Sequence, residues 1–236
     1  MHGNLDTAQP NHGATSAGLA LWFGVPAAQN HFDPAALSAP DRARFAEQRH
    51  SRRQQEFRVS RALKVVAAAD AAAAYSLSHS AGHAALLTTS LALRVGVDLE
   101  VAKERDLARI ARFAFSVAEA ELVESASSSE VRAEIFYTLW TLKEALAKAL
   151  GLALADALRD CAFEQTGHGW AGSAPTDSDW SARVYQPRGG FFLATACVGA
   201  TAHSPLQTWE WPPLQAAQWP LIACVTARAG AAVPPA

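Results

Sequence analysis

The spacing of apolar residues among polar ones divides the chain into blocks of expected helix and blocks of expected strand. An apolar patch at residues 19–25 marks where ordered structure is expected to begin. Residues 41–74 are strong helix formers with apolar side chains among many charges, which predicts one long helix or two helices broken near His50 and Ser51. Segments rich in Leu, Thr and Val follow and predict strands at residues 75–80, 84–90 and 93–101.

The second half of the chain first has helical spacing and then returns to short strands. Residues 106–125 and 130–150 are expected helices, and Gly151 provides a C-terminal stop for the second one. Further strands are expected at residues 158–165, 182–185 and 191–198. Because helices and strands occupy separate blocks, the sequence predicts an α+β fold. Residues 1–18 are expected to form a loose N-terminus, and residues 201–236 form a tail containing Pro and Trp.

The composition is that of a globular protein and argues against several classes of partner. The 236 residues are 50% hydrophobic and 18% charged, which is too apolar for intrinsic disorder. A formal net charge of −2 creates no field that would attract nucleic acid or an anionic membrane, so we expect neither as a partner. The three cysteines lack CxxC spacing, which argues against a disulfide framework or a zinc ribbon. Without a signal core or a run of ~18 apolar residues, a soluble cytoplasmic protein is expected.

The first candidate for chemistry is a pair of acids in the expected strand at residues 93–101. Side chains alternate along a strand, so Asp98 and Glu100 share one face while Val97 and Leu99 point into the core. A hard divalent cation such as Mg²⁺ would relieve the repulsion between two such carboxylates. The alternative is an exposed strand face with two solvated acids.

The second candidate lies on the expected helix at residues 130–150. Glu144 and Lys148 are four residues apart and share one helix face, with Lys143 beside them. This arrangement offers a carboxylate next to two ammonium groups. The alternative is a surface ion pair, with Trp140 as an ordinary core residue.

The third candidate lies at the end of the expected strand at residues 75–80. Ser78 and His79 place a hydroxyl beside an imidazole, and both groups can bind a phosphate oxygen. The alternative is that His79 is a hydrogen-bonded structural residue, which is also common for histidine. The spacing of His79 to His83 across Gly82 argues against a metal site with two histidines.

Together the three motifs resemble a known family in type, order and spacing. SLSHS at residues 76–80, GVDLE at 96–100 and FYTLWTLKEALAKALG at 136–151 resemble the signatures (F/Y)NxSHS, G(I/V)D(I/L)E and FxxxWxxKEAxxKxxG of the Sfp-type phosphopantetheinyl transferases. The resemblance covers about residues 40–200. It implies Mg²⁺-dependent transfer of the phosphopantetheine arm of coenzyme A to a serine hydroxyl of an apo acyl, peptidyl or aryl carrier protein, releasing adenosine 3′,5′-bisphosphate.

The resemblance also implies a role for each matching residue. The implied metal-binding carboxylates are Asp98, Glu100 and Glu144. The implied coenzyme-binding residues are Arg61, Ser78, His79, Lys143 and Lys148, with Arg53 as a possible helper. The implied catalytic residues are Lys148 together with Glu144 or Glu119, either of which could deprotonate the carrier serine.

Two positions in this set have other interpretations. Glu119 belongs to the segment FSVAE at residues 115–119, and Ser116 with Glu119 also fits an N-terminal capping box of a helix. Arg53 also fits a solvated helix face. The chain has Ser76 where family members usually carry Asn, and a serine hydroxyl forms hydrogen bonds with a shorter reach.

The fold implied by the resemblance consists of two similar α/β halves, each a small antiparallel sheet packed with helices, related by a pseudo-twofold. We expect the halves at residues 19–101 and 102–200, the active site in the cleft between them, and a monomer. Residues 41–64 carry eight Lys or Arg against three acids, a positive charge that suits coenzyme A or an acidic carrier of nonribosomal peptide or polyketide synthesis. The competing hypotheses are a non-catalytic homologue that binds carrier proteins and a Mg²⁺-dependent phosphohydrolase.

Overall fold

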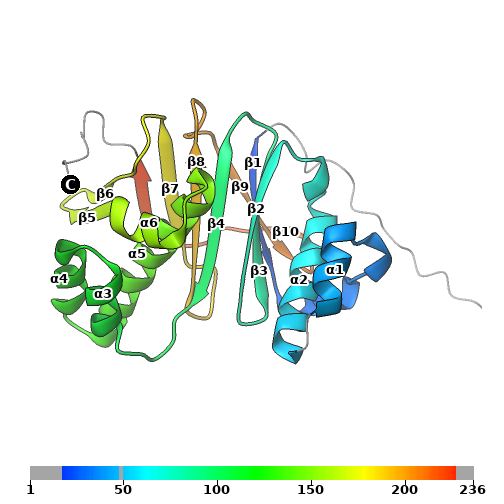
Figure 1. Cartoon of the computed structure of the whole chain (residues 1–236), viewed down its shortest axis with the longest axis horizontal. Coiled ribbons are helices and arrows are strands. Elements are labelled where there is room, and N and C mark those ends of the chain that lie inside the picture. Colours follow the sequence, from blue (N-terminus) through cyan, green and yellow to red (C-terminus); the bar gives the residue numbers. More distant parts are fainter. Residues whose placement is uncertain (1–17, 48–49, 227–236) are drawn as a thin grey trace, which may run out of the picture.

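The computed structural model describes residues 18–47 and 50–226, and its strands occupy the middle of the molecule with helices on either side (Figure 1). Within these residues the strands form a five-stranded sheet in the order β10-β9-β1-β3-β2, a four-stranded sheet in the order β11-β7-β8-β4, and a two-stranded sheet, β5-β6. The predicted α+β class is confirmed. The loose terminus expected at residues 1–18 lies, apart from Gly18, outside the described residues.

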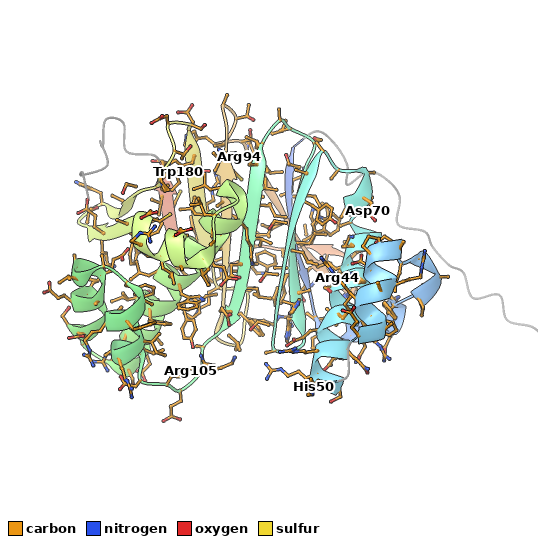
Figure 2. All side chains as sticks on the ribbon, in the orientation of Figure 1. Arg44, His50, Asp70, Arg94, Arg105 and Trp180 are labelled. Carbon is orange, nitrogen blue, oxygen red and sulfur yellow. The ribbon has the colours of Figure 1, made fainter. Side chains whose placement is uncertain are left out.

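The first sheet is built around three antiparallel strands near the start of the chain. These are β1 (Leu19–Gly24), β2 (Ala74–Ser80) and β3 (His83–Thr89). Two helices, α1 (Ala39–Glu47) and α2 (Ser51–Val66), pack beside it, and α2 runs from His50 at one end of the molecule towards Asp70 (Figures 1 and 2). Short 3-10 turns lie at Pro26–His31, Pro34–Ala36 and Ala69–Ala71.

The helical region predicted at residues 41–74 is two helices, as one of the two alternatives had it. The break lies near His50, but α2 ends at Val66 rather than continuing to residue 74. Ala68 has a left-handed backbone with φ 48°, which stops the α-helical hydrogen-bond pattern and leads into the short 3-10 turn. The remaining residues then enter β2.

The second sheet is covered by the longest helix. Its strands are β4 (Arg94–Val101), β7 (Trp180–Tyr185), β8 (Phe191–Val198) and β11 (Leu221–Thr226). The helices of this part are α3 (Leu107–Ala114), α4 (Val117–Glu124), α5 (Ser129–Leu150) and α6 (Leu154–Asp160). Helix α5 packs across β4 and β8 with its apolar face, and Gly151 ends it with φ 71°, as predicted.

Two predictions of secondary structure in this part are wrong. The helix expected at residues 106–125 is two helices, because Ser116 caps a new helix after Phe115 takes an extended backbone. The strand expected at residues 158–165 begins only at β5 (Ala162–Thr166), since its first residues belong to α6. Strand β5 pairs with β6 (Gly169–Ser173), a strand the glycine-containing sequence did not predict.

The segment after residue 201 supplies strands to both large sheets. Strand β9 (Leu206–Trp211) runs parallel to β1 and antiparallel to β10 (Gln215–Ala216), whereas β11 pairs with β7 of the second sheet. Trp219 lies between the sheets, with its ring 5.9 Å from that of Phe23 and 6.3 Å from that of Tyr185. The C-terminal segment therefore ties the two sheets together.

The expected division into halves at residue 101 stays a prediction, as does the pseudo-twofold. Strand β4, the last of the expected first half, pairs with β8 in the second sheet. None of the helices in the described part of the chain is long and apolar enough to cross a membrane.

Candidate active site

The two large sheets meet at their edge strands β2 and β4, which lie side by side in Figure 1. Alternate serines on β2 form hydrogen bonds to β4 across this seam. Ser76 Oγ accepts from the Val97 amide at 3.0 Å, Ser78 Oγ accepts from the Leu99 amide at 3.2 Å, and Ser80 Oγ donates to Glu100 Oε2 at 3.3 Å. The hydroxyls of Ser76 and Ser78 thus satisfy backbone donors of β4 that a neighbouring strand would otherwise take.

This seam gives Ser76 a clear role at the position where the family usually has Asn. Its hydroxyl holds the amide one residue before Asp98, so the shorter side chain still joins the two strands. The alternation of residues 76, 78 and 80 is the sequence signal that could have predicted the seam, because those three side chains share one strand face.

Asp98 lies at the centre of the seam, on β4, with its side chain only 2% exposed. Its Oδ1 accepts from Ser78 Oγ and from Lys148 Nζ, each at 2.9 Å. Lys148 also donates to the Val97 carbonyl at 2.9 Å and lies 3.3 Å from Glu144 Oε1. Two sheets and helix α5 therefore converge on one buried carboxylate.

Gly96 allows helix α5 to come this close to β4. A Cβ atom at this position would lie 1.9 Å from the Ala145 carbonyl oxygen and 2.8 Å from the Ala149 amide nitrogen. Both are backbone atoms of α5, so any side chain at residue 96 would push the helix away. The glycine that opens the GVDLE motif thus sets the distance between Asp98 and the side chains of α5.

The carboxylates of this site disfavour one another's charge. Burial raises the pKa of Asp98 to about 7, and Glu144 adds to the rise while Lys148 and Ser78 oppose it. Burial also raises the pKa of Glu100, with Glu144 again contributing. An added cation would reverse this effect by stabilising the charged forms.

The donor set of the site fits a hard divalent cation. Asp98 Oδ2 is buried and has no hydrogen-bond partner among the described residues, so it is an acceptor still to be satisfied. The neighbouring acids Glu100 and Glu144 supply further carboxylate oxygens, the ligand type that Mg²⁺ prefers. Across residues 18–47 and 50–226 no three His, Cys, Asp or Glu side chains are already gathered tightly enough to hold an ion.

A basic region adjoins the carboxylates. His79, half exposed at the end of β2, is close enough to Arg61 and Lys148 that both lower its pKa, in addition to the larger effect of burial. Arg61 is held by Asp41, with Nε 2.9 Å from Oδ1, and its guanidinium lies over the Phe57 ring at 4.4 Å. Three of the residues that the resemblance implies as coenzyme-binding therefore lie near one another, although they come from separate elements.

The segment that carries these acids matches a known family. Residues 94–196 match the family model of the 4′-phosphopantetheinyl transferase superfamily. For this segment the family inferred from the motifs is confirmed at the level of the superfamily. The superfamily supports phosphopantetheinyl transferase activity in general, and it implies coenzyme A and carrier proteins as partners and typically a divalent metal. The match begins at β4 and ends within β8, so it contains all three acids and Lys148. No curated protein matches the chain.

Within this superfamily domain, Lys143 and Glu119 lie together but away from solvent. Lys143 Nζ is 2.9 Å from Glu119 Oε2 and donates to the carbonyls of Leu158, at 2.9 Å, and Cys161. The side chains are 0% and 1% exposed, respectively. All three ammonium donors are thus occupied inside the core.

The Glu119 carboxylate also forms structural hydrogen bonds. It forms the capping box with Ser116 at the start of α4, and its Oε1 accepts from the Phe163 amide at 2.9 Å. The capping box that the sequence suggested as the alternative role of Glu119 is therefore confirmed. Of the remaining candidates, Arg53 is exposed on α2.

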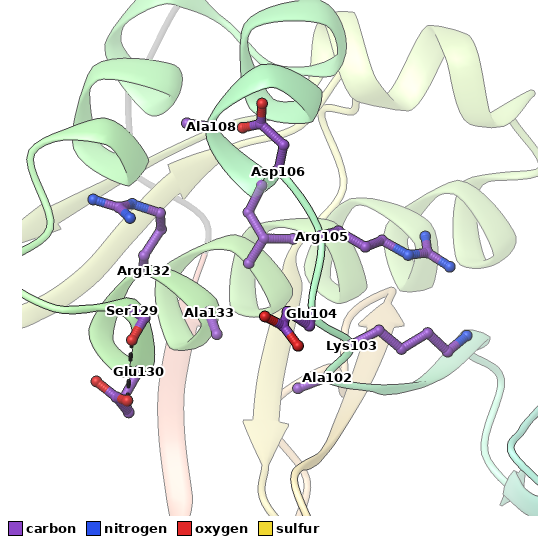
Figure 3. Close-up of a pocket in the computed structure, with 11 residues that line it drawn as sticks. Ala102, Lys103, Glu104, Arg105, Asp106, Ala108, Ser129, Glu130, Arg132 and Ala133 are labelled. Atoms are coloured by element: carbon purple, nitrogen blue, oxygen red, sulfur yellow. Dashed lines mark hydrogen bonds between the residues drawn. The ribbon is translucent and has the colours of Figure 1, made fainter.

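A pocket of about 400 Å³ lies just beyond the end of β4 (Figure 3). It is lined by residues 102–106 of the following loop, by the first two residues of α3 and by the start of α5, where Ser129 Oγ donates to Glu130 Oε1 at 3.0 Å. The side chains of Lys103 and Arg105 extend in the same direction in Figure 3. In Figure 2, Arg94 at the start of β4 and Arg105 in the loop after β4 lie at opposite ends of the molecule. Acidic and basic side chains both line the pocket, so its charge does not single out a ligand.

Proposed function

We propose that this protein is an Sfp-type enzyme that transfers the phosphopantetheine arm of coenzyme A to a serine hydroxyl of an apo carrier protein and requires Mg²⁺. The observation that carries the proposal is the convergence of Ser78, Lys148 and the unsatisfied Oδ2 of Asp98 at the seam between the sheets. Sites at such internal interfaces are typical for bound cofactors and substrates.

Asp98, Glu100 and Glu144 are the side chains that would hold Mg²⁺. When bound, the ion would neutralise negative charge on the pyrophosphate and thereby assist departure of adenosine 3′,5′-bisphosphate. Lys148 places a positive charge beside these acids, and His79, which lies near Lys148, adds an imidazole that is a cation when protonated. Their N–H groups can bind and orient phosphate oxygens. We also include Arg61, whose ion pair with Asp41 fixes its direction.

We assign the proton transfer to Glu144. Its side chain is 25% exposed and is held by Lys148, so it can meet the hydroxyl of an incoming carrier serine. Both oxygens of Glu119 already accept hydrogen bonds in the core, which supports a structural role for that residue. The same burial supports a positioning role for Lys143 in place of direct contact with coenzyme A.

The carrier protein would meet a surface with an excess of positive charge. Arg61 and Lys64 are partly neutralised by Asp41, at 2.9 and 3.2 Å, whereas the exposed face of α2 presents Arg53 and Arg58. Carriers that are acidic around their modified serine suit this face. We further propose a cytoplasmic monomer organised as two halves about a pseudo-twofold, which serves nonribosomal peptide or polyketide synthesis.

The test is mass spectrometry of an apo carrier domain incubated with this protein, coenzyme A and Mg²⁺. We expect a gain of one phosphopantetheine, about 340 Da, which EDTA abolishes. Asp98→Asn should reduce transfer by orders of magnitude, while Asp106→Asn, at an exposed helix N-cap that Asn can also fill, should retain it.

Other outcomes would replace the proposal. Binding of coenzyme A without transfer to any carrier would indicate a non-catalytic homologue that binds carrier proteins. Release of phosphate from small substrates without a carrier would indicate a phosphohydrolase.

A further inference from the structure

Glu56 is a buried acid that the function proposed above does not use. It lies on α2 and is 8% exposed, although carboxylates are rarely buried unless they are paired or hydrogen-bonded. Its two oxygens contact one side chain of the same helix and two groups of the hairpin formed by β2 and β3. Oε2 lies 3.5 Å from His79 Nδ1, and Oε1 accepts from the Gly82 amide at 3.4 Å and from Arg52 Nε at 3.3 Å.

These contacts brace the tight turn that joins β2 to β3. Ala81 and Gly82 at its centre have φ 49° and 78°, the pair of left-handed residues that a two-residue hairpin of this kind requires. Helix α2 packs directly on the turn, because a Cβ at Gly82 would lie 3.6 Å from the Gln55 side chain. Since His79 precedes the turn by only two residues, Glu56 contacts both the imidazole and the backbone that carries it.

The contact to Nδ1 selects one orientation of the His79 ring. A carboxylate beside Nδ1 favours a proton on that nitrogen, so that in the doubly protonated ring the Nε2–H group is left to donate to the ligand. The charged neighbours of His79 act in opposite senses. Burial lowers its pKa, Arg61 and Lys148 lower it further, and Glu56 raises it. Glu56 is thus the acid that supports a positive imidazole within a basic region.

We propose that Glu56 is a positioning residue for His79, holding the imidazole so that, when the ring is protonated, its Nε2–H donates to an anionic phosphate group of the substrate. The identification of that substrate as coenzyme A rests on the proposed function, whereas the contact between the two side chains does not. Glu56 itself touches no substrate and acts through the histidine.

The first test is NMR of the imidazole nitrogens in the full-length ¹⁵N-labelled protein. His79→Asn identifies the His79 signals among the eight histidines of the chain. In Glu56→Gln, which keeps an oxygen for the Gly82 amide, we expect a lower pKa for His79 and a weaker preference for the proton on Nδ1. Asp70→Asn is the matched control. It also removes an acid, but Asp70 is 73% exposed, lies just after the end of the same helix and pairs with Lys64. If Glu56→Gln changes His79 no more than Asp70→Asn does, the proposal is wrong.

The second test is a double-mutant cycle on coenzyme A affinity, measured by calorimetry in the presence of Mg²⁺. Glu56→Gln should weaken binding about three- to tenfold in the native background and have no further effect in the His79→Asn background. An equal loss in both backgrounds would show that Glu56 only stabilises the turn, which overturns the proposal. If the native protein does not bind coenzyme A, the proposed function fails and the NMR test alone decides the role of Glu56.

Discussion

Replacing Lys143 by Met separates a structural role for this lysine from the coenzyme-binding role that its motif implies. The substitution keeps an unbranched side chain of similar length but removes the charge. Because Lys143 is fully buried and 2.9 Å from Glu119, the variant would leave the Glu119 carboxylate in the core without its cation. We therefore expect a large loss of stability and little direct effect on coenzyme A binding by the folded fraction.

The size of the loss follows from the contacts of the ammonium group. Three charge-assisted interactions disappear, to Glu119 and to the carbonyls of Leu158 and Cys161, each worth about 1.5–3 kcal/mol. The buried methionine regains part of this sum by packing against Phe115 and Phe163, whose rings lie 5.6 and 6.0 Å from Nζ. Removing one partner of a buried pair typically costs about 3–5 kcal/mol, which corresponds to roughly 6–20 °C in Tm for a chain of this size.

The assay is urea unfolding of Lys143→Met, Glu119→Gln and the double variant, with Lys103→Met at an exposed lysine as control. We expect the control to lie within about 0.5 kcal/mol of the native protein. The double variant should lose at least about 1 kcal/mol less than the sum of the single losses, because each single change leaves the other charge unpaired. A stability change below about 1 kcal/mol in Lys143→Met, together with weaker coenzyme A binding, would refute the structural role.

Two further predictions follow from burial and close packing. Gly96→Ala should lower the free energy of unfolding by several kcal/mol and remove most of the transfer activity, because the added Cβ would displace α5 from Asp98. Denaturation and kinetics of the same preparation would check this. Native-like activity would show that the helix can shift without harm. When the folded protein is alkylated at pH 8, Cys224 should react rapidly because it is exposed. Cys161 and Cys197 should react slowly, because burial raises the pKa of each thiol to about 11. Intact mass spectrometry would count the labels, and three rapid additions would contradict the burial.

Features that depend on residues close in sequence could be predicted from the sequence. The period of two at residues 76–80 and 96–100 placed Ser78, Asp98 and Glu100 on strands, and the spacing of Glu144 to Lys148 placed both on one helix face. The stop at Gly151 was equally local, since it depends on one residue that adopts a left-handed backbone without strain. The α+β class followed from the order of such segments.

Other features depended on where distant segments pack. Lys143 and Glu144 are adjacent in the chain, yet Lys143 is buried and Glu144 reaches solvent, because α6 and β5 cover only one of the two positions. Likewise, Glu56 gave no local signal, since its partners His79 and Gly82 follow it by more than 20 residues. The segment after residue 201 showed little strand periodicity, and its strands form because β1 and β7 offer unpaired sheet edges.

The sequence by itself thus determined which side chains are the candidates for the chemistry and on which elements they lie, because local backbone preference and side-chain period act over a few residues. Only the tertiary structure decided which of them meet. The serine seam between β2 and β4 and the close approach of α5 at Gly96 bring Asp98 and Lys148 within 2.9 Å, although they are 50 residues apart in the chain. Burial and pairing of this kind arise from the packing of whole elements, which no short segment encodes.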